Sequence, residues 1–243
     1  KLGCWTTEFS RKFYEDNGFF LKKGGLEICR KNDDARWEEL KRKVSSGKAF
    51  GTNVRLISAA EAKEKFPLLE EDSIRGAMWD PDAGLVTPRS QDVVSFAVET
   101  AKDKGALKTF TDTPALDFEI EDGKVVGVKT DKGIIKTDKV VIASGIWGPL
   151  MGKKAGVPVP LMPLEHPLLF FGPLPEAQDA KDFLVYPLLR DQGNSAYVRD
   201  TGRLHGGMLE WGFYEDKNPR LVDPEDIGNP EKTMGSDSMR YLD

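Results

Sequence analysis

Cysteine and histidine are both scarce in this chain of 243 residues, which contains two of each. Cys4 and Cys29 are too few for a disulfide framework and show no metal-ligand spacing, so we interpret them as reduced thiols, with a single disulfide as the alternative. With two histidines, a metal site would have to be built largely from carboxylates, and no spacing of acidic residues indicates one. The sequence therefore predicts neither a metal centre nor a disulfide scaffold.

Basic clusters and long hydrophobic runs are also missing. The formal net charge is −5, with lysines and glutamates interspersed, whereas a nucleic-acid-binding protein normally needs a basic face that displaces counterions from phosphates. No apolar run is long enough to span a bilayer, and no signal-peptide pattern is present. The chain also lacks the G-x-S-x-G, H-E-x-x-H, C-x-x-C and Walker motifs. We therefore expect no nucleic-acid or membrane partner, and a location in the cytoplasm or, in a eukaryote, in the mitochondrial matrix.

What the sequence does contain is a succession of short apolar runs separated by glycine turns, which predicts a mixed α+β or α/β fold. Gly24 and Gly25 separate two expected strands as a hairpin turn would. Ser58 and Glu61 stand in capping-box register at the start of an expected helix. Residues 139–143, Lys-Val-Val-Ile-Ala, are typical of a strand buried on both faces of an α/β sheet. Helices are further expected at 33–46 and from 87 to 105, and strands at 118–120, 124–129, 134–136, 161–171, 183–189, 196–199 and 204–209, with irregular structure after Trp211.

The first candidate site is the end of the expected strand at 140–148, Val-Val-Ile-Ala-Ser-Gly-Ile-Trp-Gly. Small residues there let a ligand approach the backbone closely, at the carboxyl edge of a sheet where open α/β folds hold cofactors. The alternative is a strand that ends in an ordinary turn, with Trp147 as an anchor in the core.

The second candidate is a Glu165–His166 pair inside an apolar run. Successive strand residues point to opposite faces, so only one of the two faces a core or pocket. Because its pKa lies near neutrality, a histidine beside a cleft can orient or deprotonate a substrate. The alternative is a structural histidine whose hydrogen bonds are satisfied within the fold.

The third candidate combines Tyr197 and Arg199, which lie two residues apart in an expected strand and therefore share a face. A tyrosine hydroxyl and a guanidinium on one face can hold a small carboxylate. The alternative is a surface tyrosine that covers the stem of an arginine.

Five segments, taken in order, resemble the FAD-dependent amine oxidoreductases of the D-amino-acid-oxidase-like superfamily, and most of all their dimethylglycine and sarcosine dehydrogenases or oxidases. The resemblance runs from about Asn17 to Phe213, and the order and spacing of the segments make it specific. The segments are NGFFLKKGGLEIC, LISAAEAKEKFPLL, MWDPDAGLVTPRSQ, EIEDGKVVGVKTDKGIIKTDKVVIASGIWG and AGVPVPLMPLEHPLLF.

The resemblance implies a substrate domain with a mixed, largely antiparallel sheet and flanking helices, together with the interior part of an FAD-binding domain of the glutathione-reductase type. It places the two parts of the substrate domain at 1–86 and 157–221 and the FAD-binding part at 87–156. Residues 222–243 are then an irregular tail that leads toward a C-terminal part.

The resemblance also implies the roles of individual residues. His166 and Tyr197 are expected in the substrate pocket as catalytic residues, while Arg199 remains a substrate-binding candidate from strand geometry alone. The expected FAD contacts are Pro114 and Ala115 near the adenine, and Ala143, Ser144, Gly145 and Trp147 elsewhere along the cofactor.

The implied reaction is oxidation of a small N-methyl amino acid, in which a hydride passes from the carbon beside nitrogen to the flavin. The resulting iminium is hydrolysed to formaldehyde or captured by tetrahydrofolate. The amine must be neutral to assist hydride departure, and a histidine and a tyrosine suit its deprotonation and alignment. Sarcosine, dimethylglycine, glycine and proline-like amines all remain candidates, as do the oxidase and dehydrogenase reactions and covalent or non-covalent FAD.

One departure from the family pattern is large, because no G-x-G-x-x-G loop for the FAD pyrophosphate occurs in the chain. We therefore expect the chain to be the middle of an enzyme and to bind FAD poorly by itself. The alternatives are a non-catalytic substrate-domain or assembly module, and one subunit of a heteromeric amine oxidase. Both a homo-oligomer and a partner subunit are compatible with the sequence.

Overall fold

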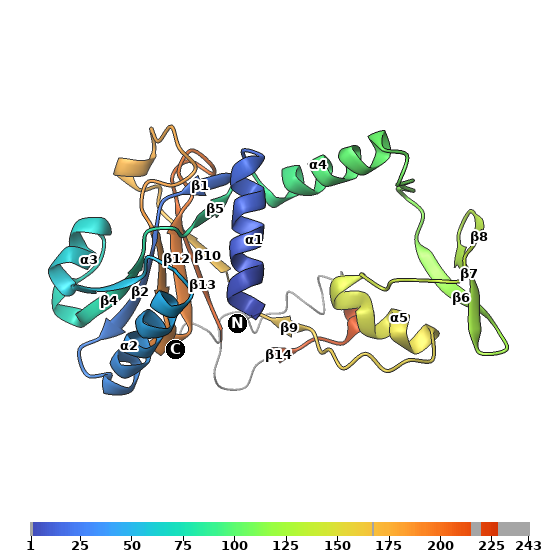
Figure 1. Cartoon of the computed structure of the whole chain (residues 1–243), viewed down its shortest axis with the longest axis horizontal. Helices are drawn as coiled ribbons and strands as arrows, with labels where there is room; N and C mark the ends of the chain where they lie inside the picture. Colours follow the sequence, from blue (N-terminus) through green and yellow to red (C-terminus); the bar gives the residue numbers. More distant parts are fainter. Residues whose placement is uncertain (1, 167, 215–219, 228–243) are drawn as a thin grey trace. The chain divides into compact units, whose positions relative to one another are not determined.

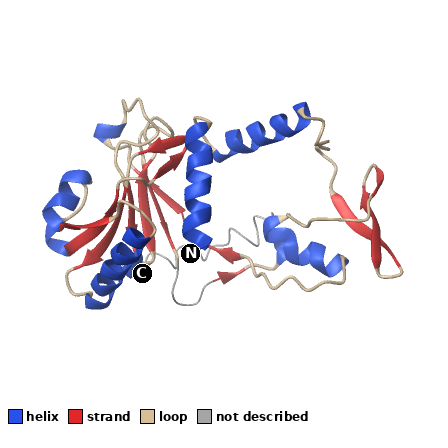
Figure 2. Ribbon diagram, in the orientation of Figure 1, coloured by secondary structure: helices blue, strands red, loops and turns tan. Residues whose placement is uncertain are grey.

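The computed structural model describes residues 2–166, 168–214 and 220–227. The chain forms two compact units, one from residues 1–100 and 167–216 and the other from residues 101–166 and 217–243. The helices and strands of both units are labelled in Figure 1 and coloured by type in Figure 2. Most of the expected tail, residues 228–243, lies outside the described residues.

A seven-stranded mixed sheet is the centre of the first unit (Figure 2). Its order is β10-β13-β12-β11-β2-β4-β3, and only the β11–β2 pair is parallel. This largely antiparallel sheet confirms the expected fold class. The strands are β2 (Gly25–Arg30), β3 (Arg55–Ser58), β4 (Ile74–Asp80), β10 (Leu168–Phe171), β11 (Leu188–Asp191), β12 (Ala196–Asp200) and β13 (Leu209–Phe213).

The core of this unit lies on one face of the sheet, under α3 (Ala59–Lys65). Helix α3 begins where the sequence predicts, because the Ser58 hydroxyl accepts a hydrogen bond from the Glu61 backbone N–H at 3.1 Å. Strand side chains alternate between the faces, so every second residue enters the core. The main buried side chains are Leu26, Ile28, Ile57, Ala62, Phe66, Ala77, Leu189 and Val198.

Helix α2 (Asp34–Ala49) packs against the opposite face of the sheet, over β3 and β4. Asp33 caps its first turn by accepting from the Arg36 N–H at 2.8 Å, as expected from the predicted start of the helix. Its Lys43 donates to Glu27 of β2 at 2.6 Å, and the Trp37 ring lies against Gly76 of β4. One half of this second face is thus covered by a helix.

The remaining helices of the first unit are α1 (Leu2–Asp16) and α4 (Ser90–Asp103), whose last residues belong to the second unit. A separate two-stranded ribbon pairs β1 (Phe20–Lys22) with β5 (Gly84–Val86). Short 3₁₀ helices occur at η1 (Glu71–Ser73), η3 (Pro175–Ala177) and η4 (Gln192–Asn194). Within the described residues, no helix is long and apolar enough to cross a membrane, and no group of three or more metal-ligating side chains is found.

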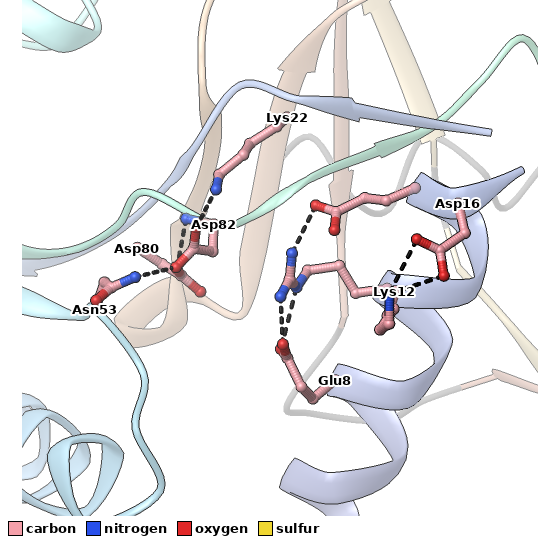
Figure 3. A network of polar contacts seen from close by, with 9 residues as sticks. Glu8, Lys12, Asp16, Lys22, Asn53, Asp80 and Asp82 are labelled. Carbon is pink, nitrogen blue, oxygen red and sulfur yellow. Dashed lines mark hydrogen bonds and ion pairs between the residues drawn. The ribbon is translucent and has the colours of Figure 1, made fainter. Parts of the chain in front are cut away.

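An ion-pair network ties the ribbon to its surroundings (Figure 3). Asp82 contacts Lys22 and accepts a hydrogen bond from Asn53 at 2.7 Å. These two partners hold the pKa of the Asp82 carboxyl below its ordinary value, with the larger contribution from Lys22. The turn after β4 is therefore fastened to β1 by charge.

The hairpin expected at Gly24–Gly25 is wrong, although both of its strands exist. β1 pairs with β5, whereas β2 pairs with β4 and β11. Gly24 adopts a φ of +86°, and a Cβ there would lie 1.9 Å from the Trp79 ring. The glycine therefore serves a close approach by tryptophan rather than a hairpin turn.

Three other predicted strands have shifted boundaries. The run at 161–171 is divided into β9 (Leu164–Glu165) and β10, and the run at 183–189 becomes a strand only at Leu188. The prediction at 204–209 is wrong for most of its length, because β13 begins at Leu209. Residues before it form turns in which His205, Gly206 and Gly207 all have positive φ.

The second unit contains the expected run of strands at 118–136. β6 (Ala115–Glu121), β7 (Lys124–Thr130) and β8 (Gly133–Lys136) form an antiparallel sheet, and Asp122–Gly123 make the first turn with φ of +48° and +75°. A short helical segment follows, with η2 (Gly145–Trp147) leading into α5 (Gly148–Lys154), which contacts β6. A two-residue pairing of β9 with β14 (Arg220–Leu221) and the 3₁₀ helix η5 (Pro224–Asp226) complete the described part.

The strand expected at 139–143 is wrong. These residues belong to no strand, and Val141 is 88% exposed. A strand exchanges its backbone hydrogen bonds with a neighbouring strand, and among the described residues no strand pairs with this segment. The apolar pattern is that of a parallel-sheet strand, but its neighbours are not among the strands described.

The two cysteines are expected to differ sharply toward a thiol reagent. Cys29 is fully buried, and burial together with the nearby Asp33 carboxylate raises the pKa of its thiol, whereas Cys4 is exposed. Because the thiolate is the reacting form, we expect one fast thiol per native chain at pH 8 and two after denaturation. Counting modified thiols by mass spectrometry checks this, with Cys4→Ser as control. Two equally fast thiols in the native chain would contradict the buried position of Cys29.

Candidate functional site

The half of the second sheet face that lies beyond α2 is the candidate substrate-facing surface of the first unit. Register places Tyr197 opposite Gly212 and Arg199 opposite Glu210, and it places Leu168 and Phe170 opposite the same two residues of β13. Directly opposed residues share a face, so these six residues form two parallel rows. The face is open at its β10 edge, since Leu168 and Phe170 are 46% and 44% exposed.

Tyr197 lies across β13, with its ring over the Gly212 backbone and 5.9 Å from the Tyr214 ring between centroids. Burial raises the pKa of the Tyr197 hydroxyl above its ordinary value, and Tyr214 and Glu210 raise it further, against a smaller opposing effect of Arg199. The hydroxyl is therefore neutral near pH 7 and can both donate and accept a hydrogen bond. Such a group can align an amine without adding charge to the face.

Arg199 is held by a carboxylate of the chain itself. Its Nε and Nη2 atoms donate to Glu210 Oε2 at 3.0 and 2.6 Å, and Glu210 is 9% exposed. Both partners come from directly opposed positions of β12 and β13, so the pair is set by strand register. The positive charge that could attract a substrate carboxylate is therefore balanced by Glu210, and the guanidinium is fixed in one orientation.

His166 lies in the second unit, just after β9, where it is exposed. Its neighbour Glu165 forms an ion pair with Arg220 of β14 at 3.2 Å, across a directly opposed pair of residues. Glu165 thus has a structural partner on its own sheet. The structure brings Tyr197 and Arg199 together on one strand of the first unit and places His166 in the other unit.

The residues expected to contact FAD all lie in the second unit. Pro114 and Ala115 lead into β6, and Ala143, Ser144, Gly145 and Trp147 lead into α5.

Three features of the segment before α5 fit a cofactor. The Ser144 hydroxyl oxygen is buried but has no hydrogen-bond partner among the described residues. Gly145, with a φ of +55°, has nothing within 4 Å of where a Cβ would stand, and the Trp147 ring beside it is 48% exposed. An unpaired hydroxyl, an open backbone and an aromatic ring suit contact with a ligand that is both polar and aromatic, as FAD is.

A cleft of about 1250 Å³ also lies in the first unit, between α1 and the turn after β4. None of the residues predicted from the sequence line it. Its charged side chains largely pair with one another, as Lys22 does with Asp82 and Arg11 does with Glu8. We therefore place the candidate site on the open sheet face and not in this cleft.

Sequence reasoning missed three residues of the site, which are Glu210, Gly212 and Tyr214 on or beside β13. The signal that points to Gly212 is a glycine inside an apolar strand, which often marks close approach of another group. Glu210 is two residues earlier and so shares its face, but only strand register pairs it with Arg199.

Comparison with known proteins identifies the family of this chain. The family model described as FAD dependent oxidoreductase, DAO, matches residues 2–234. Mitochondrial sarcosine dehydrogenase of Homo sapiens is 31% identical over 219 residues, which is 85% of this chain and 22% of that protein. The mitochondrial pyruvate dehydrogenase phosphatase regulatory subunit of Mus musculus is 27% identical over 91% of this chain and 24% of its own length.

Among solved structures, L-proline dehydrogenase from P. horikoshii superposes with a TM-score of 0.70 and 31% sequence identity, covering 87% of this chain and 55% of that one. The chain thus spans about a quarter of the length of these two curated relatives and about half of the solved structure. The resemblance inferred from five sequence segments is confirmed by these matches. This chain belongs to the DAO family of FAD-dependent oxidoreductases.

Proposed function

We propose that this chain is the substrate-presenting part of an FAD-dependent amine oxidoreductase that oxidises a small N-methyl amino acid such as sarcosine or dimethylglycine. The observation that carries the proposal is the family match over residues 2–234, together with an open sheet face that presents a neutral tyrosine beside a fixed arginine. The named relatives support an amino acid whose nitrogen carries a second carbon substituent, because sarcosine and proline both have one.

In this proposal His166 and Tyr197 are the catalytic residues and Arg199 binds the substrate. FAD, when bound, supplies the hydride acceptor. Tyr197 would hold the amine in line through its neutral hydroxyl, and His166 would take up the proton that the amine must lose before oxidation. Arg199, oriented by Glu210, would direct its guanidinium edge toward the substrate carboxylate.

The FAD contacts in the proposal are Pro114, Ala115, Ala143, Ser144, Gly145 and Trp147, and the unpaired Ser144 hydroxyl supports them.

The proposed substrate domain comprises 1–86 and 157–221, the proposed FAD-binding part comprises 87–156, and 222–243 is the tail. The division of the chain into two compact units, each made of two separate segments, supports an arrangement of this kind. The same proposal includes tetrahydrofolate as the acceptor of the one-carbon unit. It also includes assembly into a homo-oligomer or with a partner subunit.

The test is the visible absorption of the flavin in the full-length parent enzyme, loaded with FAD, before and after anaerobic addition of sarcosine or dimethylglycine. We expect the flavin band to bleach. His166→Ala and Tyr197→Phe should each slow the bleaching by about 100-fold, as expected for loss of a group that handles a proton. Tyr14→Phe on α1 is the matched control and should change nothing.

If both site variants bleach at the wild-type rate, the assignment of His166 and Tyr197 is wrong.

The second candidate function is a non-catalytic module, which is favoured by the similarity to a phosphatase regulatory subunit over 91% of the chain. That function predicts no bleaching with any N-methyl amino acid, even with FAD in excess.

A further inference from the structure

Gly212 lies directly under the Tyr197 ring. A Cβ built on Gly212 would lie 2.1 Å from Tyr197 Cζ, 2.2 Å from its hydroxyl oxygen and 2.6 Å from Cε2. These distances are far inside van der Waals contact, so no residue with a side chain fits at position 212 while Tyr197 keeps its place. The two residues are directly opposed on β12 and β13, which fixes this relation by strand register.

Glycine is a poor strand residue, because it has no side chain to pack and loses much conformational freedom on folding. Gly212 sits within β13, flanked by Trp211 and Phe213, where an apolar residue would otherwise be expected. Its backbone conformation is not in the left-handed region, so conformational need does not account for a glycine here. The close approach of Tyr197 is the feature that requires it.

The other sides of this slot are bounded as well. Tyr214, two residues further along, contacts the Tyr197 ring at 5.9 Å between centroids. The Arg199–Glu210 pair occupies the adjacent row of the same face. The tyrosine ring is therefore confined by Tyr214 and the ion pair, with the glycine backbone as its floor.

We propose that Gly212 is a positioning residue, whose missing side chain forms the slot that seats the Tyr197 ring and fixes its hydroxyl over β13. The proposal rests on the proposed function insofar as Tyr197 acts on substrate, but the slot itself is a property of the sheet. An alanine methyl would fill the slot and turn the ring out of it. The hydroxyl lies at the far end of the ring and would therefore be displaced the farthest.

The test compares Gly212→Ala, Tyr197→Phe and the double variant. The chain has five tyrosines, so subtracting the tyrosinate absorbance titration of Tyr197→Phe from that of the wild type isolates Tyr197. In the wild type its pKa is raised by burial, Tyr214 and Glu210, and opposed by Arg199. Gly212→Ala should lower this pKa toward the ordinary value as the ring becomes exposed.

Flavin bleaching by sarcosine is the second readout. Displacement of a reacting group by about 1 Å can lower a rate about 100-fold, so Gly212→Ala should lose as much as Tyr197→Phe. The double variant should lose no more than either single one, because a phenylalanine has no hydroxyl to misplace. Gly127→Ala, within β7 of the second unit, is the matched glycine control, since a Cβ there meets only the movable Ile134 methyl at under 3.0 Å.

An unchanged Tyr197 titration together with an unchanged bleaching rate in Gly212→Ala would overturn the proposal. A Tyr197→Phe variant that bleaches normally would instead count against the proposed function, while the titration would still decide whether the slot exists. If Gly212→Ala does not fold, Gly212→Ala/Tyr197→Ala decides the question. Recovery of folding in this double variant supports the slot, and continued misfolding shows that β13 itself needs the glycine and overturns the proposal.

Discussion

Replacing Asp200 with alanine is expected to lower the free energy of unfolding by about 3–5 kcal/mol. Asp200, at the end of β12, is completely buried. Its Oδ1 accepts hydrogen bonds from the backbone N–H groups of Val185 and Gly202, and its Oδ2 accepts one from Tyr186, all at 2.8 Å. Alanine would leave three donors without their acceptor in a place that water reaches poorly, and each such group costs about 1–3 kcal/mol.

The variant Asp200→Asn tests the hydrogen bonds of the two carboxylate oxygens separately. The amide oxygen can keep the two bonds made by Oδ1, but its NH₂ group would face the Tyr186 N–H, a donor against a donor. We therefore expect a loss of roughly half that of alanine. Asp179→Ala, at an exposed turn, is the control and should stay within about 0.5 kcal/mol of wild type.

Urea denaturation followed by tryptophan fluorescence measures all three variants, because Trp79 packs against the core. Equal midpoints for Asp200→Ala and Asp179→Ala would show that the carboxylate does not organise the segment before β11.

Arg199→Met is expected to lower the free energy of unfolding by about 2–3 kcal/mol, because it leaves the Glu210 carboxylate largely buried without its cation. The loss should be smaller than for a fully buried pair, since the Arg199 side chain is still about one-third exposed. The double variant Arg199→Met/Glu210→Met should be less destabilised than Arg199→Met alone, because no charge is then left unpaired.

Arg190→Met is the matched control on the neighbouring strand. Arg190 lies opposite Tyr197 on β11 and is exposed, so its replacement should change stability by less than about 0.5 kcal/mol. Urea titrations of the wild type, Arg199→Met, Glu210→Met and the double variant give the coupling energy directly. A coupling near zero would mean that Arg199 is not held by Glu210 and is available as a simple carboxylate clamp.

Local features of this fold were readable from the chain. Ser58 caps α3, and Asp33 begins α2 where the sequence predicts, because a cap needs only residues within one turn. The Asp122–Gly123 turn between β6 and β7 is equally local. That Tyr197 and Arg199 share a face also follows from the two-residue repeat of a strand.

Pairing between distant segments was not readable in this way. The Gly24–Gly25 hairpin failed because β1 finds its partner in β5, more than sixty residues away. Before β11 begins at Leu188, the Asp200 carboxylate accepts the backbone N–H groups of residues 185 and 186, a long-range contact that no local pattern announces. Residues 139–143 carry the composition of a buried strand, yet composition alone supplies no neighbour with which to form hydrogen bonds.

The sequence by itself determined the family and the largely antiparallel mixed fold, because the order of the segments is a property of the chain. It also determined that a tyrosine and an arginine share one face of a strand, because side chains alternate along any strand. Only the tertiary structure decided that Glu210 holds that arginine and that Gly212 makes room for that tyrosine. Both relations depend on the register between β12 and β13, and register is settled by packing over the whole sheet rather than by either strand alone.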